Sequence, residues 1–290
     1  MSVACERARS IDLSSYTLRA GSVRDALILA AKNGARVRVR LEANPIDDAA
    51  GTLHAANADT IARLRAVGAD AGVTAPGSPV MHMKAAVVDG VAWLDDRNWA
   101  GSGSETVIRD SDRDDVAAVA DGLAGGTGAD GHLRTHKGAA QYLEADVIAR
   151  AGPAPLLVES ESFGSGLIYN ALLHRAQAHE PSRLIVAGRE ALQAGPRGDV
   201  ERHRLARLAS FGVDIRVGSG GDDDLDEKLA VAPGNAWVGS TNATYARAAA
   251  GEQLDWGLAT RDPGLVDTLR ARFERNWQLA KPLSPVSPPS

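Results

Sequence analysis

Residues 80–90 read Val80-Met81-His82-Met83-Lys84-Ala85-Ala86-Val87-Val88-Asp89-Gly90, and they are followed by Val91-Ala92-Trp93-Leu94 and Asp95-Asp96-Arg97-Asn98-Trp99. His82 and Lys84 alternate with their neighbours, so a strand would place the imidazole and the ammonium on one face. Asp89-Gly90 is typical of a hairpin turn, and the second apolar run then leads to Asn98. An imidazole, a lysine and an amide suit attack on a phosphodiester and binding of its charged oxygens. The alternative interpretation is an edge strand whose His82 and Lys84 simply face solvent.

The spacing His-x-Lys-x4-Asp at residues 82, 84 and 89, with Asn98 after the second apolar run, resembles the HKD signature of the phospholipase D superfamily. The resemblance implies an α/β fold of two duplicated βαβ units, with mixed, mostly parallel sheets flanked by helices and a pseudo-twofold relation that brings both motifs into one cleft. It also implies that one histidine forms a phosphohistidine while the other protonates the leaving oxygen. No metal or other cofactor is expected, because two lysines already neutralise the developing charge.

Composition is consistent with this fold class. The chain has 290 residues, of which 44% are hydrophobic and 24% charged, so it can bury one large core or two modest ones. Aromatic residues make up only 4%, which favours helices packed closely on sheets over an aromatic-rich sandwich.

Charge and cysteine content exclude several other classes. The formal charge is −5, and the acidic run Asp222-Asp223-Asp224 would repel polyanions, so stable nucleic-acid binding is not expected. Cys5 is the single cysteine, which rules out a disulfide framework or a cysteine-rich zinc site within a monomer. No stretch approaches transmembrane length, and residues 1–10 lack the apolar core of a signal peptide. We therefore expect a cytoplasmic protein that is a monomer or a homodimer.

Strand and helix patterns alternate along the chain. The first half is expected to contain strands at 11–16, 37–41 and 71–74 and helices at 23–33, 60–67 and 114–123. The second half is expected to contain strands at 156–160, 183–188 and 213–217, a hairpin at 229–238, and helices at 167–178 and 199–210. This order predicts βαβ units and a largely parallel sheet with antiparallel hairpins.

An internal repeat connects the two halves. The differences 228 − 84 and 242 − 98 both equal 144, which pairs Lys84 with Lys228 and Asn98 with Asn242, and Trp93 and Gly90 find Trp237 and Gly234 at the same offset. Such self-similarity indicates a duplicated unit. We predict a first half at 1–150, a second half at 151–282 and a disordered tail at 283–290.

The second copy of the motif is altered. Asp226 stands where the first copy has His82, and Pro233 stands where it has Asp89. The second half nevertheless retains Lys228 and the sequence Gly239-Ser240-Thr241-Asn242, which matches the Gly-Ser-x-Asn of the family.

The resemblance assigns roles to individual residues. His82 would be the nucleophile, Asp89 would orient or stabilise an imidazole, and the phosphoryl oxygens would be bound by Lys84, Lys228, Asn98, Asn242 and Ser240. Glu159 and Glu161 are auxiliary candidates, with helix capping as the alternative.

The missing proton donor has three candidate replacements. The first is a carboxylic acid at Asp226 or Glu227, which the neighbouring Lys228 would oppose by favouring the ionised form. The others are His136, which follows the glycine-rich segment 122–131, and a second His82 from a homodimer. The acid function is therefore either carried by a carboxylate, supplied from elsewhere or lost.

Two classes of function follow from these residues. The chain is a phospholipase D-like phosphodiesterase that hydrolyses or transfers a phospholipid or another small diester through His82, or it is a pseudoenzyme that binds phosphate-containing ligands. A nuclease is disfavoured by the acidic charge and the scarcity of aromatics for base stacking.

Overall fold

The computed structural model describes residues 1–46, 48, 50–99, 106–126, 128, 131–191, 195–219, 225, 227–245 and 253–283, without the side chains of residues 190, 191 and 197. The expectations for Asp226, for the acidic run 222–224 and for the tail from residue 284 onward lie outside these residues. The chain divides into two compact units. The first contains Met1–Ala140 and Ala249–Trp256, and the second contains Gln141–Ala248 and Gly257–Ser290.

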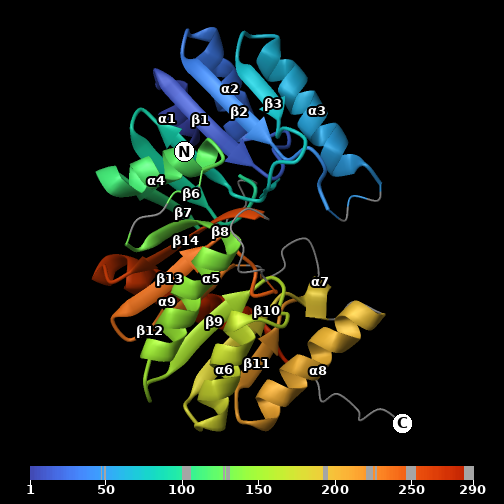
Figure 1. Cartoon of the computed structure of the whole chain (residues 1–290), viewed down its shortest axis with the longest axis vertical. Coiled ribbons are helices and arrows are strands. Elements are labelled where there is room, and N and C mark those ends of the chain that lie inside the picture. The colour runs from blue at the N-terminus through green and yellow to red at the C-terminus, as the bar shows by residue number, and fades with distance from the viewer. Residues whose placement is uncertain are drawn as a thin grey trace. The chain divides into compact units, whose positions relative to one another are not determined.

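The first unit is built on a sheet with the strand order β3-β2-β1-β5-β6-β7 (Figure 1). The neighbours β1, β2 and β3 are parallel, and β5, β6 and β7 continue the sheet with antiparallel pairing. The strands are β1 (Ser10–Ser15), β2 (Arg36–Leu41), β3 (Asp70–Val73), β5 (Ala85–Val88), β6 (Val91–Asp95) and β7 (Val107–Asp110). The helices are α1 (Ser2–Glu6), α2 (Ser22–Lys32), α3 (Thr52–Arg65) and α4 (Arg113–Leu123).

The core of this unit joins alternate strand residues to one stripe of each helix. Leu13 of β1 lies opposite Val39 of β2, which in turn lies opposite Ala71 of β3. These side chains form one buried cluster with Leu27 of α2 and Leu64 of α3. Burying a side chain the size of leucine contributes about 1.5–3 kcal/mol, so this shared apolar face holds α2 and α3 on the sheet.

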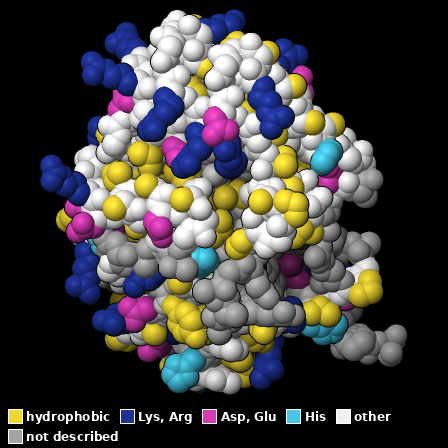
Figure 2. Space-filling model, turned by 45° about the horizontal axis from the view of Figure 1, so that its top comes forward, with side chains coloured by type: hydrophobic (Ala, Val, Ile, Leu, Met, Phe, Trp, Pro, Cys, Tyr) yellow, Lys and Arg dark blue, Asp and Glu magenta, His cyan; other side chains and the backbone are white. Residues whose placement is uncertain are grey.

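Two arginines of β2, Arg38 and Arg40, form ion pairs with neighbouring strands. Arg38 pairs with Asp12 of β1, and Arg40 Nη2 lies 2.9 Å from both carboxylate oxygens of Asp70 on β3. Figure 2 shows the same intermixing more widely, with basic, acidic and hydrophobic side chains interspersed on the visible face. The arginines therefore do not form an unpaired basic stripe of the kind that phosphate backbones attract.

The second unit repeats this strand order. Its sheet follows β15-β11-β10-β9-β12-β13-β14, in which β9, β10 and β11 are parallel and the other neighbours antiparallel. The strands are β9 (Leu156–Ser160), β10 (Ser182–Val186), β11 (Asp214–Val217), β12 (Leu229–Ala232), β13 (Asn235–Gly239), β14 (Gln253–Thr260) and β15 (Lys281–Pro282). The helices are α5 (Lys137–Arg150), α6 (Leu167–Gln177), α7 (Gly188–Ala191), α8 (Pro196–Ser210) and α9 (Pro263–Leu279).

The strand β14 is shared between the units, because its residues up to Trp256 belong to the first unit and those from Gly257 onward to the second. The first-unit part of β14 pairs in parallel with the short strand β4 (Val80–Met81), with Gln253 opposite Val80 and Leu254 opposite Met81. A further short strand, β8 (Leu133–His136), also pairs with β14. Segments from three distant parts of the sequence therefore meet at this strand.

The predicted fold class is confirmed, since two partly parallel sheets are flanked by helices. The helix expected at 60–67 begins earlier, at Thr52, because Gly51 in the left-handed conformation and Asp48, which accepts from the Leu53 and His54 N–H groups, start it there. In the described part of the chain, none of the helices has the length and apolar content needed to cross a membrane.

Candidate active site

His82 lies directly after β4, in the extended connection to β5, rather than within a strand as expected. The N–H groups of Met81 and His82 both donate hydrogen bonds that hold this segment. The Met81 N–H donates to the buried carboxylate of Glu42 at 2.7 Å, and the His82 N–H donates to the Leu254 carbonyl of β14 at 2.9 Å. These bonds fix the backbone from which the imidazole extends.

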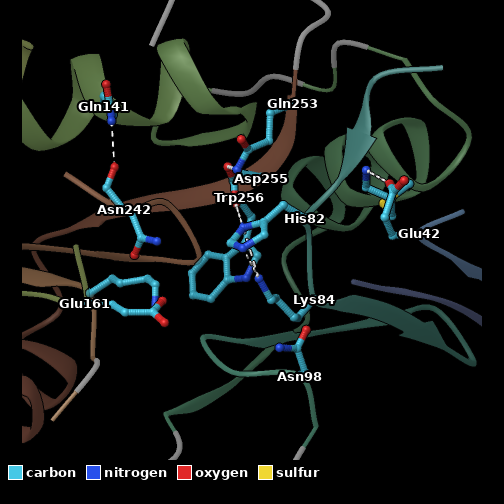
Figure 3. A network of polar contacts seen from close by, with 12 residues as sticks. Glu42, His82, Lys84, Asn98, Gln141, Glu161, Asn242, Gln253, Asp255 and Trp256 are labelled. Carbon is cyan, nitrogen blue, oxygen red and sulfur yellow. Dashed lines mark hydrogen bonds and ion pairs between the residues drawn. The ribbon is translucent and has the colours of Figure 1, made fainter. Parts of the chain in front are cut away.

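The imidazole of His82 lies between a carboxylate and an ammonium (Figure 3). Nδ1 is 2.7 Å from Oδ1 of Asp255 on β14, and Nζ of Lys84 is 3.0 Å from both ring nitrogens. The ring of Tyr16 contacts His82 edge to face, with the ring centroids 5.2 Å apart. The His82 side chain is 18% exposed, whereas that of Asp255 is fully buried. The ring therefore contacts a buried carboxylate while part of its surface remains accessible to solvent.

Electrostatics keep Asp255 ionised. Burial alone would raise the pKa of its carboxyl group, but the positive charge and hydrogen bond of His82, together with the charges of Lys84 and Lys137, outweigh burial and hold that pKa below its ordinary value. An ionised carboxylate only accepts hydrogen bonds, so Nδ1 of His82 must carry the proton that it donates to Asp255. In a neutral ring this leaves the lone pair on Nε2, which is the arrangement that a nucleophilic imidazole needs.

Lys84 is buried beneath this histidine, with 2% of its surface exposed. Its carbonyl accepts from the Asp95 N–H at 2.9 Å, and its ammonium lies 5.9 Å from the centre of the Tyr16 ring. The predicted proximity of His82 and Lys84 on one side of the chain is therefore present, although the connection that carries them is not a strand.

Asn98 follows β6 in a turn held by two buried carboxylates. The Trp99 N–H donates to Asp95 at 2.6 Å, and the Thr106 N–H donates to Asp96 at 2.9 Å. Oδ1 of Asn98 accepts from the Thr17 N–H at 3.3 Å, so the amide oxygen is used within the unit. The two aspartates that stand in place of Gly-Ser in this half thus have a structural role in shaping the turn.

The carboxylate of Asp89 bonds to the backbone at the start of β1. It accepts from the Arg9 N–H at 3.0 and 3.1 Å and from the Ser10 N–H at 2.8 Å. Because β5 rises about 3.3 Å per residue, it carries Asp89 away from the imidazole of His82. Within the first unit, the carboxylate that contacts His82 is that of Asp255.

Lys228 occupies a matching backbone position in the second unit. Its carbonyl accepts from the Gly239 N–H at 3.1 Å, which reproduces the bond between Lys84 and Asp95 at the offset of 144. Its ammonium is buried and lies 3.1 Å from Oε2 of Glu161, which also pairs with Arg189. Burial would raise the pKa of Glu161, but these two cations outweigh burial and place that pKa well below its ordinary value.

The remaining candidates of the second unit have individual partners. Glu159 is fully buried and accepts from the side-chain amide of Asn276 at 3.0 and 3.1 Å. Ser240 is also fully buried. The carbonyl of Asn242 accepts from the amide of Gln141 at 2.7 Å, and the Asn242 side chain points away from Gln141 in Figure 3.

Of the two carboxylic acids considered as proton donors, Glu227 belongs to the described residues and Asp226 does not. Glu227 is buried and lies 2.6 Å from Nε of Arg272, a contact that favours the ionised carboxylate and opposes service as an acid.

His136 is the last residue of β8, and only 8% of its surface is exposed. Neither ring nitrogen has a hydrogen-bond partner among the described residues. Lys137, which begins α5, has its pKa lowered by burial, an effect that the nearby charge of Asp255 opposes.

Asp255 and Lys137 were both missed by sequence reasoning. A signal for Asp255 was available, because Leu254, Trp256 and Leu258 alternate around it and predict a strand with an acidic residue among apolar ones. Nothing in the sequence joins this strand to His82, which lies 173 residues earlier. Among the described residues no cluster of three or more His, Cys, Asp or Glu side chains has the arrangement of a metal site.

No protein family model matches the chain, and no curated protein matches it. The solved structures that resemble it include phosphatidylserine synthase from Haemophilus influenzae Rd KW20, with 11% identity and a TM-score of 0.69 over 97% of this chain and 84% of that one. Polyphosphate kinase from Porphyromonas gingivalis has 17% identity and a TM-score of 0.66 over 95% of this chain, which spans about half of the kinase chain, 47%. Nuc from Salmonella typhimurium, a phospholipase D family member, matches 52% of this chain and 97% of its own with 16% identity and a TM-score of 0.43.

Proposed function

We propose that the chain is an enzyme that cleaves or transfers a phosphodiester through Nε2 of His82. The proposal draws on the resemblance of residues 82–98 to the HKD signature and on the similarity of the fold to that of phosphatidylserine synthase. The observation that carries this proposal is the contact of His82 with Asp255 on one side and with Lys84 on the other. A hydrogen-bonded carboxylate orients an imidazole and stabilises its positive charge, as in other nucleophile and base pairs.

The chemistry follows from the geometry. The Nε2 lone pair of His82 forms a bond to phosphorus, and the electron pair of the broken P–O bond leaves with the alcohol oxygen. The ammonium of Lys84 is 3.0 Å from Nε2, so an oxygen of a phosphoryl group bonded to that nitrogen through phosphorus comes within its reach. Asp255 stabilises the positive charge that the ring acquires in the phosphohistidine. Water or an alcohol then attacks phosphorus, and the N–P bond pair returns to the imidazole.

The substrates that we propose are a phospholipid or another small diester. In the first unit, Lys84 and Asn98 are the groups that we propose for holding the charged phosphoryl oxygens. Lys228, Asn242 and Ser240 are the corresponding candidates of the second unit. A pseudoenzyme that binds phosphate without turnover remains the second candidate, because Asp226 stands where the second histidine of the family motif would be.

Trapping of the intermediate tests the proposal. The protein is incubated with phosphatidylcholine, phosphatidylglycerol or bis-p-nitrophenyl phosphate, quenched at alkaline pH and analysed by peptide mass spectrometry. We expect a phosphoryl adduct on the peptide containing His82 and none in His82→Ala. The matched control is His54→Ala, which removes an exposed histidine of the same unit and should retain the adduct. Binding of phosphate without adduct or product for any diester would favour the pseudoenzyme.

A further inference from the structure

We propose that His136 is the second imidazole of this site and the proton donor to the leaving oxygen, an inference that rests on the proposed function. The reaction requires a proton on the departing alcohol, and the second copy of the motif has no histidine to supply it. His136 comes from outside both copies of the motif, at the junction of β8 and α5.

The backbone brings this junction to the strand that holds His82. β8, which ends at His136, pairs with β14, and β14 carries Asp255. The residue next to His136 is Lys137, whose charge and that of Asp255 act on each other across the junction. His82, Asp255 and Lys137 therefore lie within electrostatic reach of one another, and His136 is covalently adjacent to the last of them.

The side chain of His136 is buried with its hydrogen-bonding capacity unused by the described residues, as in a group that binds a ligand. Both ring nitrogens are buried and have no hydrogen-bond partner among the described residues. Buried polar groups in folded proteins are almost always hydrogen-bonded, so these two ring nitrogens call for an explanation such as a bound molecule.

The position of Thr135 indicates the direction of the His136 imidazole. The hydroxyl of Thr135 donates to the Gly128 carbonyl at 2.8 Å, and its side chain lies against Gly122 of α4. Successive strand residues face opposite sides, so the imidazole of His136 is directed away from α4.

The proton transfers balance over the two steps. As His82 attacks phosphorus, protonated His136 gives its proton to the leaving oxygen and becomes neutral. In the second step neutral His136 takes a proton from water as the water oxygen attacks phosphorus, and the N–P bond pair returns to His82. The net reaction is hydrolysis of the diester, with both imidazoles restored.

A pair of substrates separates acid catalysis from a structural role. Methyl p-nitrophenyl phosphate loses a weakly basic phenolate that needs no proton, whereas methyl phenyl phosphate loses a more basic one that does. Because general acid catalysis contributes about 10²–10⁴-fold, His136→Gln should reduce kcat/KM for methyl phenyl phosphate by about 100-fold and leave methyl p-nitrophenyl phosphate nearly unaffected. An equal loss with both substrates, or no loss with either, would overturn the inference.

Nitrogen-15 NMR of the histidine rings, with inorganic phosphate as the probe, provides a test that needs no turnover. We expect the ring signals of His82 and His136 to shift together at phosphate concentrations that leave the exposed His54 unchanged. A shift of His82 alone would overturn the role of His136 while leaving the proposed function intact. If neither signal shifts, the phosphate site that both proposals require is absent.

Discussion

The contact between Asp255 and His82 makes a prediction about stability that does not depend on the substrate. Asp255→Asn keeps the shape of the side chain but removes the negative charge that faces His82, Lys84 and Lys137. Breaking a buried ion pair from one side costs about 3–5 kcal/mol. Because the His82 side chain is 18% exposed and water can solvate part of it, we expect a loss near the lower end, about 3 kcal/mol.

The assay must report on the first unit, since two units can unfold separately. Urea unfolding followed by hydrogen exchange of peptides that cover β5 and β6 meets this need. Asp59→Asn is the matched control, because Asp59 is half exposed and pairs with Arg63 of α3 and Arg24 of α2, and exposed pairs contribute about 0.2–1 kcal/mol each. Equal losses for the two variants would refute the view that Asp255 holds a buried, charged site together.

The stability difference between the native protein and Asp255→Asn should decrease as pH falls. The pKa of Asp255 is lowered in the folded protein, so its contribution is present above the unfolded value of about 4 and is lost as pH falls through the folded pKa. The advantage of the native protein over Asp255→Asn should therefore vanish in acid. The double variant with Lys84→Met should recover part of the loss, because it removes a buried positive charge that Asp255 compensates in the native protein.

Three further predictions concern other buried or bonded carboxylates. Burial and a hydrogen bond with Asp110 raise the pKa of Asp115 to about 7 against the opposing effect of His132. The unfolded carboxyl titrates at about 4, so in thermal unfolding the native protein should lose stability relative to Asp115→Asn as pH rises from about 4 to about 7. Glu161→Gln leaves Lys228 and Arg189 without their anion and should cost about 2–3 kcal/mol in urea unfolding of the second unit, with partial recovery when Lys228→Met is added. Asp89→Asn retains a residue suited to the positive φ of 47° but weakens the bonds to the Arg9 and Ser10 N–H groups, so a loss of about 1 kcal/mol is expected, and no change in unfolding would contradict that role.

Sequence reasoning reached the fold because the relevant signals were local. Alternating residues predicted β1 and β2, and the offset of 144 matched Lys84 with Lys228, whose carbonyls accept equivalent backbone hydrogen bonds. The contact between His82 and Lys84 also follows from their spacing of two residues. The strand patterns and the spacing of His82 and Lys84 depend on neighbours in the chain, and the repeat appears when the two halves are compared, so the sequence displays all three directly.

The partners of these residues were harder to predict because they are distant in sequence. Asp89 follows the spacing of the family motif, yet its local surroundings at the start of β1 give its carboxylate backbone donors that the motif does not reveal. Asp255 contacts His82 only after β4 has paired with β14, a parallel pairing between short segments that carries almost no pattern of its own. Tertiary pairing thus decided which carboxylate reached the imidazole.

The division of β14 between the units limits how the chain can be cut. A fragment that stops after α5 would contain His82, Lys84 and His136 but would lack Asp255, so its imidazole would have no carboxylate. The same limit applies during synthesis, when the N-terminal part emerges first. Asp255 follows His82 by 173 residues, so the contact between them can form only after this whole stretch has been synthesised.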